Sequence, residues 1–225
     1  MLFRSELLQG EGRDRSTMAF TKVMYEEPEI VPYIPSFIKE KEGLSGTDRG
    51  SAYHKIMELI DFKYLFETWK EYKDKQAIQG EIQRQMEEME RSGKITSVIR
   101  EAVDVAKIEG FLQTPLAKRM MRAAGAGCLY KEQPFVLGLP ASRLNSTFPE
   151  TETVLIQGII DVFFLEEDGI VVADYKTDRV KMPGELQMRY QVQLDYYGEA
   201  LERLLGRKVR EKIIYSFALN RSIDL

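Results

Sequence analysis

The feature that most constrains this chain is a pair of apolar, strand-like segments, 153–165 and 170–176, joined by the turn residues Glu166–Gly169. Both segments are rich in β-branched and aromatic residues, and an acidic turn that ends in glycine is typical of a β-hairpin. Each segment nevertheless contains an aspartate, Asp161 in the first and Asp174 in the second. A carboxylate inside a buried strand costs free energy unless a cation neutralises it. The hairpin therefore predicts a sheet that carries an acidic site.

The register of this hairpin decides which side chains share a face. With a two-residue turn at Asp168-Gly169, Asp161 lies opposite Lys176, whereas a four-residue loop places Asp161 opposite Asp174. Because strand side chains alternate between faces, both registers put the three side chains on one face, where two carboxylates can share a metal ion. A three-residue loop without a bulge would separate them.

Two aspartates on one face favour Mg²⁺ or Mn²⁺, which prefer oxygen ligands. Such an ion would hold a phosphate group, generate a hydroxide-like nucleophile and offset the charge that develops during hydrolysis. Lys176 would orient the water molecule or stabilise the transition state electrostatically. The alternative is a buried ion pair between Lys176 and either aspartate, which is the more common explanation of an isolated Asp-x-Lys sequence.

The remaining pattern predicts helices first and a sheet afterwards. The 3.6-residue apolar period predicts helices over 47–59, over 64–91 with a break near Gly80, and over 94–124 as two helices separated near 110–114; further strands are predicted at 128–138 and 212–219, and a helix at 185–205. This order indicates an α/β fold with a helical portion, 46–125, before an α/β core, 126–225. Residues 1–45 contain three scattered prolines and are expected to be an irregular arm or linker from a larger protein.

Composition excludes several classes of protein. Cys128 is the single cysteine, which rules out an internal disulfide and a four-cysteine zinc or iron–sulfur site. We find no apolar run long enough for a membrane span or a signal peptide, so we expect no membrane association and a cytoplasmic location. The net charge of −4 argues weakly against a surface that grips DNA everywhere, but it allows a local basic groove. No phosphate-binding G-x-x-x-x-G-K-[ST] loop is present, so these residues are not an ATP-driven motor.

Five short motifs in the right order resemble one enzyme family. They are Arg49-Gly50-Ser51-Ala52-Tyr53-His54, Glu132-x-Pro134-Phe135, Gly158-x-x-Asp161, Asp174-Tyr175-Lys176-Thr177 and Tyr190-x-x-Gln193-x-x-x-Tyr197. The Asp161 and Asp174-x-Lys176 pair resembles the core of the PD-(D/E)XK nucleases, and the five motifs together resemble the RecB-family subgroup. The similarity covers about residues 45–222 and is greatest to the C-terminal nuclease domain of AddA-type (RexA) subunits of bacterial helicase–nucleases.

This resemblance implies a fold and a set of roles. The fold would be a restriction-endonuclease-like core, a mixed central sheet flanked by helices. Roles carried over by position make Lys176 the catalytic lysine, alongside the aspartates. The implied metal ligands are Asp161, Asp174, the Tyr175 carbonyl and His54, and the residues implied to contact DNA or to support the site are Gln193, Tyr197, Tyr190 and Glu132. Two purely structural alternatives stay open. His54 could be a structural or solvated histidine, and Tyr190 and Tyr197 could be core residues.

The implied function is a Mg²⁺-dependent deoxyribonuclease, with Mn²⁺ as a substitute and no organic cofactor. It would degrade single strands exonucleolytically as a helicase delivers them, in double-strand break repair and recombination in the bacterial cytoplasm. Its partners would be DNA, helicase domains of the same parent chain and an AddB-type (RexB) second subunit. The alternatives are a DNA- or partner-binding module with a nuclease-like fold that does not cut, and a metal-free scaffold held by a buried ion network.

Overall fold

The computed structural model describes residues 46–72 and 75–225, so the expected arm at 1–45 lies outside the described residues. The described helices before the sheet are α2 Gly46–Leu59, α3 Phe62–Tyr72, α4 Lys75–Arg91, α5 Ser97–Ala102, α6 Val105–Leu112 and α7 Pro115–Gly125. They are followed by β1 Leu129–Pro140, the 3₁₀ turn η2 Ala141–Arg143, β2 Thr153–Glu166, β3 Gly169–Lys176, α8 Pro183–Leu205, β4 Val209–Ser216 and β5 Arg221–Asp224.

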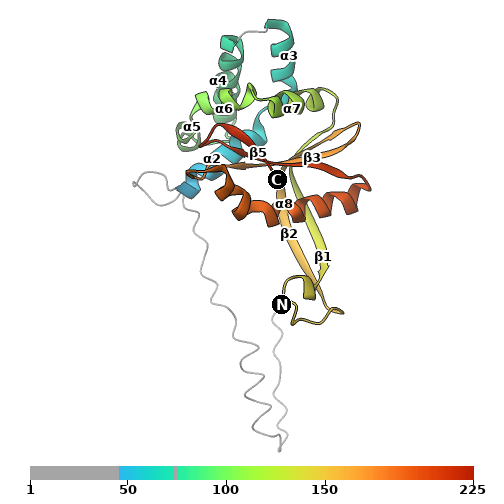
Figure 1. Ribbon diagram of the computed structural model, residues 1–225. Helices are drawn as coiled ribbons and strands as arrows, with labels where there is room; N and C mark the ends of the chain where they lie inside the picture. Colours follow the sequence, from blue (N-terminus) through green and yellow to red (C-terminus); the bar gives the residue numbers. More distant parts are fainter. Residues whose placement is uncertain (1–45, 73–74) are drawn as a thin grey trace, which may run out of the picture. The chain divides into compact units, whose positions relative to one another are not determined.

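The strands form one five-stranded mixed sheet in the order β1-β2-β3-β4-β5. Strand β3 pairs in parallel with β4, and the other neighbours are antiparallel. The parallel pair requires a crossover, which α8 supplies. Helices α2–α7 lie on one side of the sheet and α8 on the other (Figure 1). The expected mixed sheet flanked by helices is confirmed.

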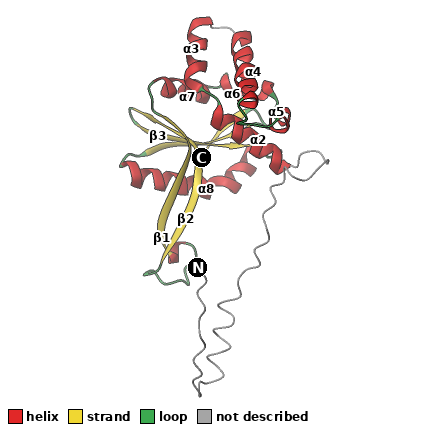
Figure 2. Ribbon diagram, turned by 180° about the vertical axis from the view of Figure 1, so that it is seen from behind, coloured by secondary structure: helices red, strands yellow, loops and turns green. Residues whose placement is uncertain are grey.

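Each face of the sheet builds its own core because successive strand residues point to opposite faces. On the helical side, Val162, Ala173 and Tyr215 pack against the helices. The predicted stripe of Tyr53, Ile56 and Met57 in α2, with Ile60 directly after the helix, is buried, and each residue is at most 3% exposed. On the other side, Val172 and Ile214 pack against Leu194 and Leu201 of α8. The sheet therefore lies between two layers of helix, with one core on each face (Figure 2).

The helix boundaries differ from the predicted ones at two places. Gly80 lies inside α4 and does not break it; α3 ends earlier, at Tyr72, and α4 begins at Lys75. A solvent-facing glycine costs a helix only about 1 kcal/mol, and good helix formers surround this one. The segment 94–124 holds three helices, because Asp104 ends one run and caps the next by accepting a hydrogen bond from the Ala106 amide.

Two features of the sheet also correct the sequence analysis. The hairpin register with a two-residue turn at Asp168-Gly169 is wrong. Leu165 pairs with Ile170, which is the register of the alternative with a four-residue loop. Strand β4 begins at Val209, three residues before the predicted start. A short edge strand, β5, follows it and was not predicted, since four residues with two charges carry little strand signal.

Strands β1 and β2 continue as a hairpin beyond the rest of the sheet (Figures 1 and 2). One face of this extension packs Leu137 and Leu139 near Ala200 of α8. Its other face leaves Val136 and Leu155 more than 60% exposed. Among the described residues, no helix is both long enough and apolar enough to cross a membrane.

Candidate active site

Asp161 and Asp174 lie where β2 and β3 separate. The last paired residues are Val162 and Ala173, so the two aspartates are the next residues of their strands and occupy facing positions. The Tyr175 amide donates a hydrogen bond to Asp161 Oδ2 at 2.8 Å, although the ladder has ended. This bond fixes the Asp161 carboxylate in the opening between the strands.

Asp174 is completely buried and forms an ion pair with Lys176. The distance from Lys176 Nζ to Asp174 Oδ2 is 2.6 Å, although that oxygen accepts no hydrogen bond of good geometry. Burial, together with the charge of Asp161, raises the pKa of Asp174 to about 7, even though Lys176 acts in the opposite direction. A cation placed between the two carboxylates would remove this electrostatic cost.

His54 reaches the site from the helical side of the sheet. Helix α2 packs closely on the end of β3, since a Cβ atom at Gly50 would lie 3.1 Å from Thr177 Oγ1. One turn later, His54 Nδ1 lies 3.3 Å from Asp161 Oδ1. Burial disfavours the charged imidazole, but the hydrogen bond and charge of Asp161 outweigh burial and raise the pKa of His54.

Glu132 of β1 approaches from the third side. It falls between the pairs Lys131–Val162 and Gln133–Ile160, which places it opposite Asp161. Its φ of 47° is the left-handed conformation that residues other than glycine rarely adopt. Ligand atoms of His54, Glu132 and Asp161 all lie within 4.8 Å of one another. Burial and the charge of Asp161 raise the pKa of Glu132.

The glycine of the Gly158-x-x-Asp161 motif has a packing reason. Gly158 pairs with Phe135 across the β1–β2 ladder. A Cβ atom at Gly158 would lie 2.9 Å from the Phe135 ring, which is too close for a carbon–carbon contact. The Phe135 ring in turn packs edge-on against Tyr197 of α8, at 5.5 Å between ring centroids. Phe135 therefore joins three of the motifs recognised in the sequence.

Helix α8 brings its polar and aromatic residues to the opposite end of Asp174. Gln193 Nε2 lies 3.4 Å from Asp174 Oδ1 and also donates to the Tyr197 hydroxyl. Tyr190 places its ring 4.2 Å from Lys176 Nζ. The structure thus brings together all nine residues singled out in the sequence. Tyr197 and Tyr190 also pack in the core on the α8 side of the sheet.

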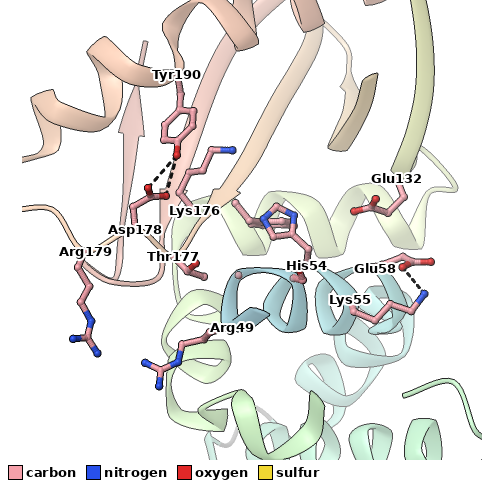
Figure 3. Close-up of a pocket in the computed structure, with 13 residues that line it drawn as sticks. Arg49, His54, Lys55, Glu58, Glu132, Lys176, Thr177, Asp178, Arg179 and Tyr190 are labelled. Carbon is pink, nitrogen blue, oxygen red and sulfur yellow. Dashed lines mark hydrogen bonds and ion pairs between the residues drawn. The ribbon is translucent and has the colours of Figure 1, made fainter. Parts of the chain in front are cut away.

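A pocket of about 1090 Å³ opens over this cluster. Figure 3 shows His54 and Glu132 on one side of Lys176, and Arg49 and Arg179 on the other. Within the part of the chain that the structure describes, neither arginine has a carboxylate partner.

The sequence motifs assign no role to Arg49, Arg179 or Asp178. Asp178 accepts a hydrogen bond from the Tyr190 hydroxyl. The only available signal was that these three residues lie within or beside the recognised motifs.

Comparison with known proteins agrees with this geometry. The pattern of the PD-(D/E)XK nuclease superfamily matches residues 33–221. The A-type subunit of an ATP-dependent helicase/nuclease from Lachnoclostridium phytofermentans is 36% identical over 87% of this chain and 16% of that protein. Proteins of the same name from Acetivibrio thermocellus and Clostridium novyi are 36% and 34% identical, over 84% and 92% of this chain and 14% and 16% of those proteins. The chain thus spans about one sixth of the length of these relatives.

Proposed function

This chain belongs to the PD-(D/E)XK nuclease superfamily, and from that premise we propose that residues 46–225 form a metal-dependent deoxyribonuclease domain. The observation that carries the proposal is the convergence of His54, Asp161, Asp174 and Lys176 from three separate elements, beside a pocket that His54 and Lys176 line. A buried ion pair alone would need only Lys176 and one aspartate. A bound cation would account for the second carboxylate and the imidazole.

The donor set fits a small divalent cation. Asp161 and Asp174 offer hard oxygen atoms, and burial together with the charge of Asp161 raises the pKa of Asp174. His54 and Glu132 add a nitrogen and a third carboxylate within reach of Asp161. We assign these four residues and the Tyr175 carbonyl as ligands. Mg²⁺ suits the oxygen atoms, and Mn²⁺ tolerates the imidazole better.

The ion, when bound, would polarise the scissile phosphate and lower the pKa of its water ligand. Residues of the chain would perform the remaining tasks. The Tyr175 amide holds Asp161 in position, and Gln193 does the same for Asp174. Lys176, only 13% exposed, would orient the attacking water and offset the charge of the transition state. The ammonium group already lies in the pocket, so little rearrangement of the side chain is needed when the transition state forms.

DNA would enter along the pocket wall formed by Arg49 and Arg179. Two arginines without carboxylate partners in the described structure are free to bind phosphate groups. Gln193 and Tyr197 would support the site from α8.

In the complete protein we propose that helicase domains of the same chain and a second subunit deliver single strands to this pocket. The activity would serve break repair and recombination in the bacterial cytoplasm.

Cleavage of end-labelled single-stranded DNA tests the proposal. We expect cutting in Mg²⁺ or Mn²⁺ that is lost in EDTA and in Lys176→Ala. Lys208→Ala is the matched control, because Lys208 is 83% exposed and lies outside the pocket. Isothermal titration with Mn²⁺ gives an independent readout, and Lys176→Ala should keep the metal. A chain that neither cuts DNA nor binds Mn²⁺ would contradict the proposal.

A further inference from the structure

The ammonium group of Lys176 has two neighbours that differ in chemistry. One is the Asp174 carboxylate, with 2.6 Å between Lys176 Nζ and Oδ2. The other is the face of the Tyr190 ring, whose centroid lies 4.2 Å from the same nitrogen. An aromatic face carries partial negative charge and attracts a cation at this distance. Figure 3 shows the lysine side chain beside the ring.

Tyr190 is itself held in place. Its hydroxyl donates to the Asp178 carboxylate, with 3.1 Å to each oxygen. Asp178 also accepts a hydrogen bond from Arg189 Nη1 at 2.8 Å. Asp178 lies two residues after Lys176, whereas Tyr190 and Arg189 belong to α8. These contacts therefore connect the end of β3 to the first half of α8, and the Tyr190 ring contacts Lys176 while its hydroxyl binds Asp178.

We propose that Tyr190 is a positioning residue whose ring keeps the Lys176 ammonium group in the pocket when Asp174 binds the metal ion. The inference rests on the proposed function, in which the Asp174 carboxylate is a metal ligand. A metal ion on that carboxylate weakens its attraction for the lysine, which has a long and flexible side chain. The ring then supplies the remaining attraction.

A ring suits this task better than a further carboxylate. A carboxylate would compete with Asp161 and Asp174 for the cation, and it would accept hydrogen bonds from the ammonium group. The ring does not bind the metal, and its contact with an N–H group of Lys176 is weaker than a hydrogen bond to a carboxylate. The other N–H groups of the lysine stay available for the attacking water and the phosphate oxygens.

The first measurement detects the contact without any catalysis. A methylene group beside a positive charge that lies over a ring face has its proton resonances shifted upfield by the ring current. We expect such a signal in the NMR spectrum of the full chain with labelled lysine, and its loss in Lys176→Arg identifies it. Tyr190→Phe should retain the shift and Tyr190→Leu should lose it. A normal shift in the unaltered chain would overturn the inference.

The second measurement separates positioning from packing. Replacing Tyr190 with phenylalanine, and then with a fluorinated phenylalanine of nearly the same shape, weakens the negative face without removing the ring. We expect kcat to fall only slightly for Tyr190→Phe and about tenfold further for the fluorinated ring, with KM for DNA and Mn²⁺ affinity unchanged.

Tyr64→Leu is the control, because the Tyr64 ring also faces a cation, Arg84 at 5.3 Å, but lies outside the pocket. Equal kcat values for Tyr190→Phe and for the fluorinated phenylalanine at the same position would overturn the positioning role. An unaltered chain that does not cut DNA would contradict the proposed function, and the NMR shift would still support or overturn the contact.

Discussion

At the scale of single residues, Asp174 shows how the site and the fold make opposite demands. Its carboxylate is completely buried, faces Asp161 and has Lys176 as its one cationic neighbour at ion-pair distance within the described structure. The pKa of about 7 means that the folded protein resists ionisation of this group. Fold stability would therefore favour a neutral side chain at this position, whereas metal binding needs the ionised one.

Asp174→Asn separates these two demands. The amide has nearly the same shape as the carboxyl group and removes the buried charge. We therefore expect the free energy of unfolding of the metal-free protein to rise by about 1–2 kcal/mol at neutral pH. The same change removes a metal ligand, so Mn²⁺ affinity should fall at least about tenfold. Thermal unfolding in EDTA and isothermal titration measure the two effects. A variant that is destabilised without metal would show that the ion pair with Lys176 outweighs the burial.

Arg49 and Arg179 make a prediction about salt. Binding of single-stranded DNA in Ca²⁺, measured by fluorescence anisotropy, should weaken linearly with the logarithm of salt concentration. Each Arg→Gln change at these positions should reduce that slope by about 0.7, the value for one lost phosphate contact. Arg122→Gln makes the same charge change on the exposed surface of α7 and should leave the slope unaltered. Identical slopes for all variants would remove these arginines from the DNA path.

The positions of the candidate residues could be predicted because the relevant chemistry is written locally. Asp161 and Asp174 are conspicuous as charges inside apolar strands. The partners of Tyr190 were not predictable in this way, since Asp178 and Arg189 are ordinary charged residues in sequence. They become meaningful only when the crossover to α8 brings the two segments together.

At the scale of the elements, local signals determined type better than boundary. The strands β1–β3 and helix α8 were predicted because their apolar periods are long. The extra break at Asp104 depends on a single capping side chain, which the surrounding apolar period conceals. The hairpin register was left open because the turn sequence fits more than one loop length. The observed register pairs Leu165 with Ile170 and Glu166 with Gly169. It differs from the first alternative by two residues, which leaves every side chain on the same face, so the apolar pattern does not distinguish the two.

Arg119 links α7 to the sheet and gives a prediction for pH. Its guanidinium donates to both Glu166 of β2 and Glu211 of β4, at 2.7–2.9 Å. The hydrogen bond with Arg119 holds the pKa of Glu166 below its usual value. A carboxylate with a lowered pKa in the folded state stabilises the protein above its unfolded pKa, and this contribution is lost as the pH falls.

We therefore expect Arg119→Met to cost about 1–3 kcal/mol near pH 7. Urea unfolding at several pH values should show the difference from the unaltered protein shrinking as the pH falls below the ordinary range for glutamate. Arg143→Met is the control, because Arg143 pairs with Glu199 on a more exposed part of the surface. A difference that is constant with pH would assign the effect of Arg119 to packing alone.

At the scale of the whole molecule, the site lies at a seam. His54 comes from the helical layer, whereas Glu132, Asp161 and Asp174 come from three adjacent strands of the sheet. Close packing of Gly50 on Thr177 brings α2 to the C-terminal end of β3, the central strand of the sheet. A metal ion bound by these residues would join the two layers, so metal binding should stabilise the contact between the layers as well as the site itself.

This arrangement predicts where the stabilisation by metal is felt. At a Mn²⁺ concentration of about 100 times Kd, global unfolding should cost about 2.7 kcal/mol more than in EDTA. Hydrogen exchange of α2 amides should slow about 100-fold, the factor that corresponds to this free energy. The reason is that α2 cannot leave the sheet without removing His54 from the metal. Amides of α4, which provides none of the candidate ligands, should show no change beyond the global effect.

His54→Leu tests whether the link runs through the imidazole. The variant keeps the three carboxylates of the sheet, so weaker Mn²⁺ binding should persist and still slow exchange in β2 and β3. Exchange in α2 should no longer respond to the metal, even at concentrations that saturate the variant. Glu67→Gln, a change at an exposed carboxylate of α3, controls for nonspecific binding. If α2 in His54→Leu were protected as strongly as in the unaltered protein, packing around Gly50 would join the layers and the metal would act on the sheet alone.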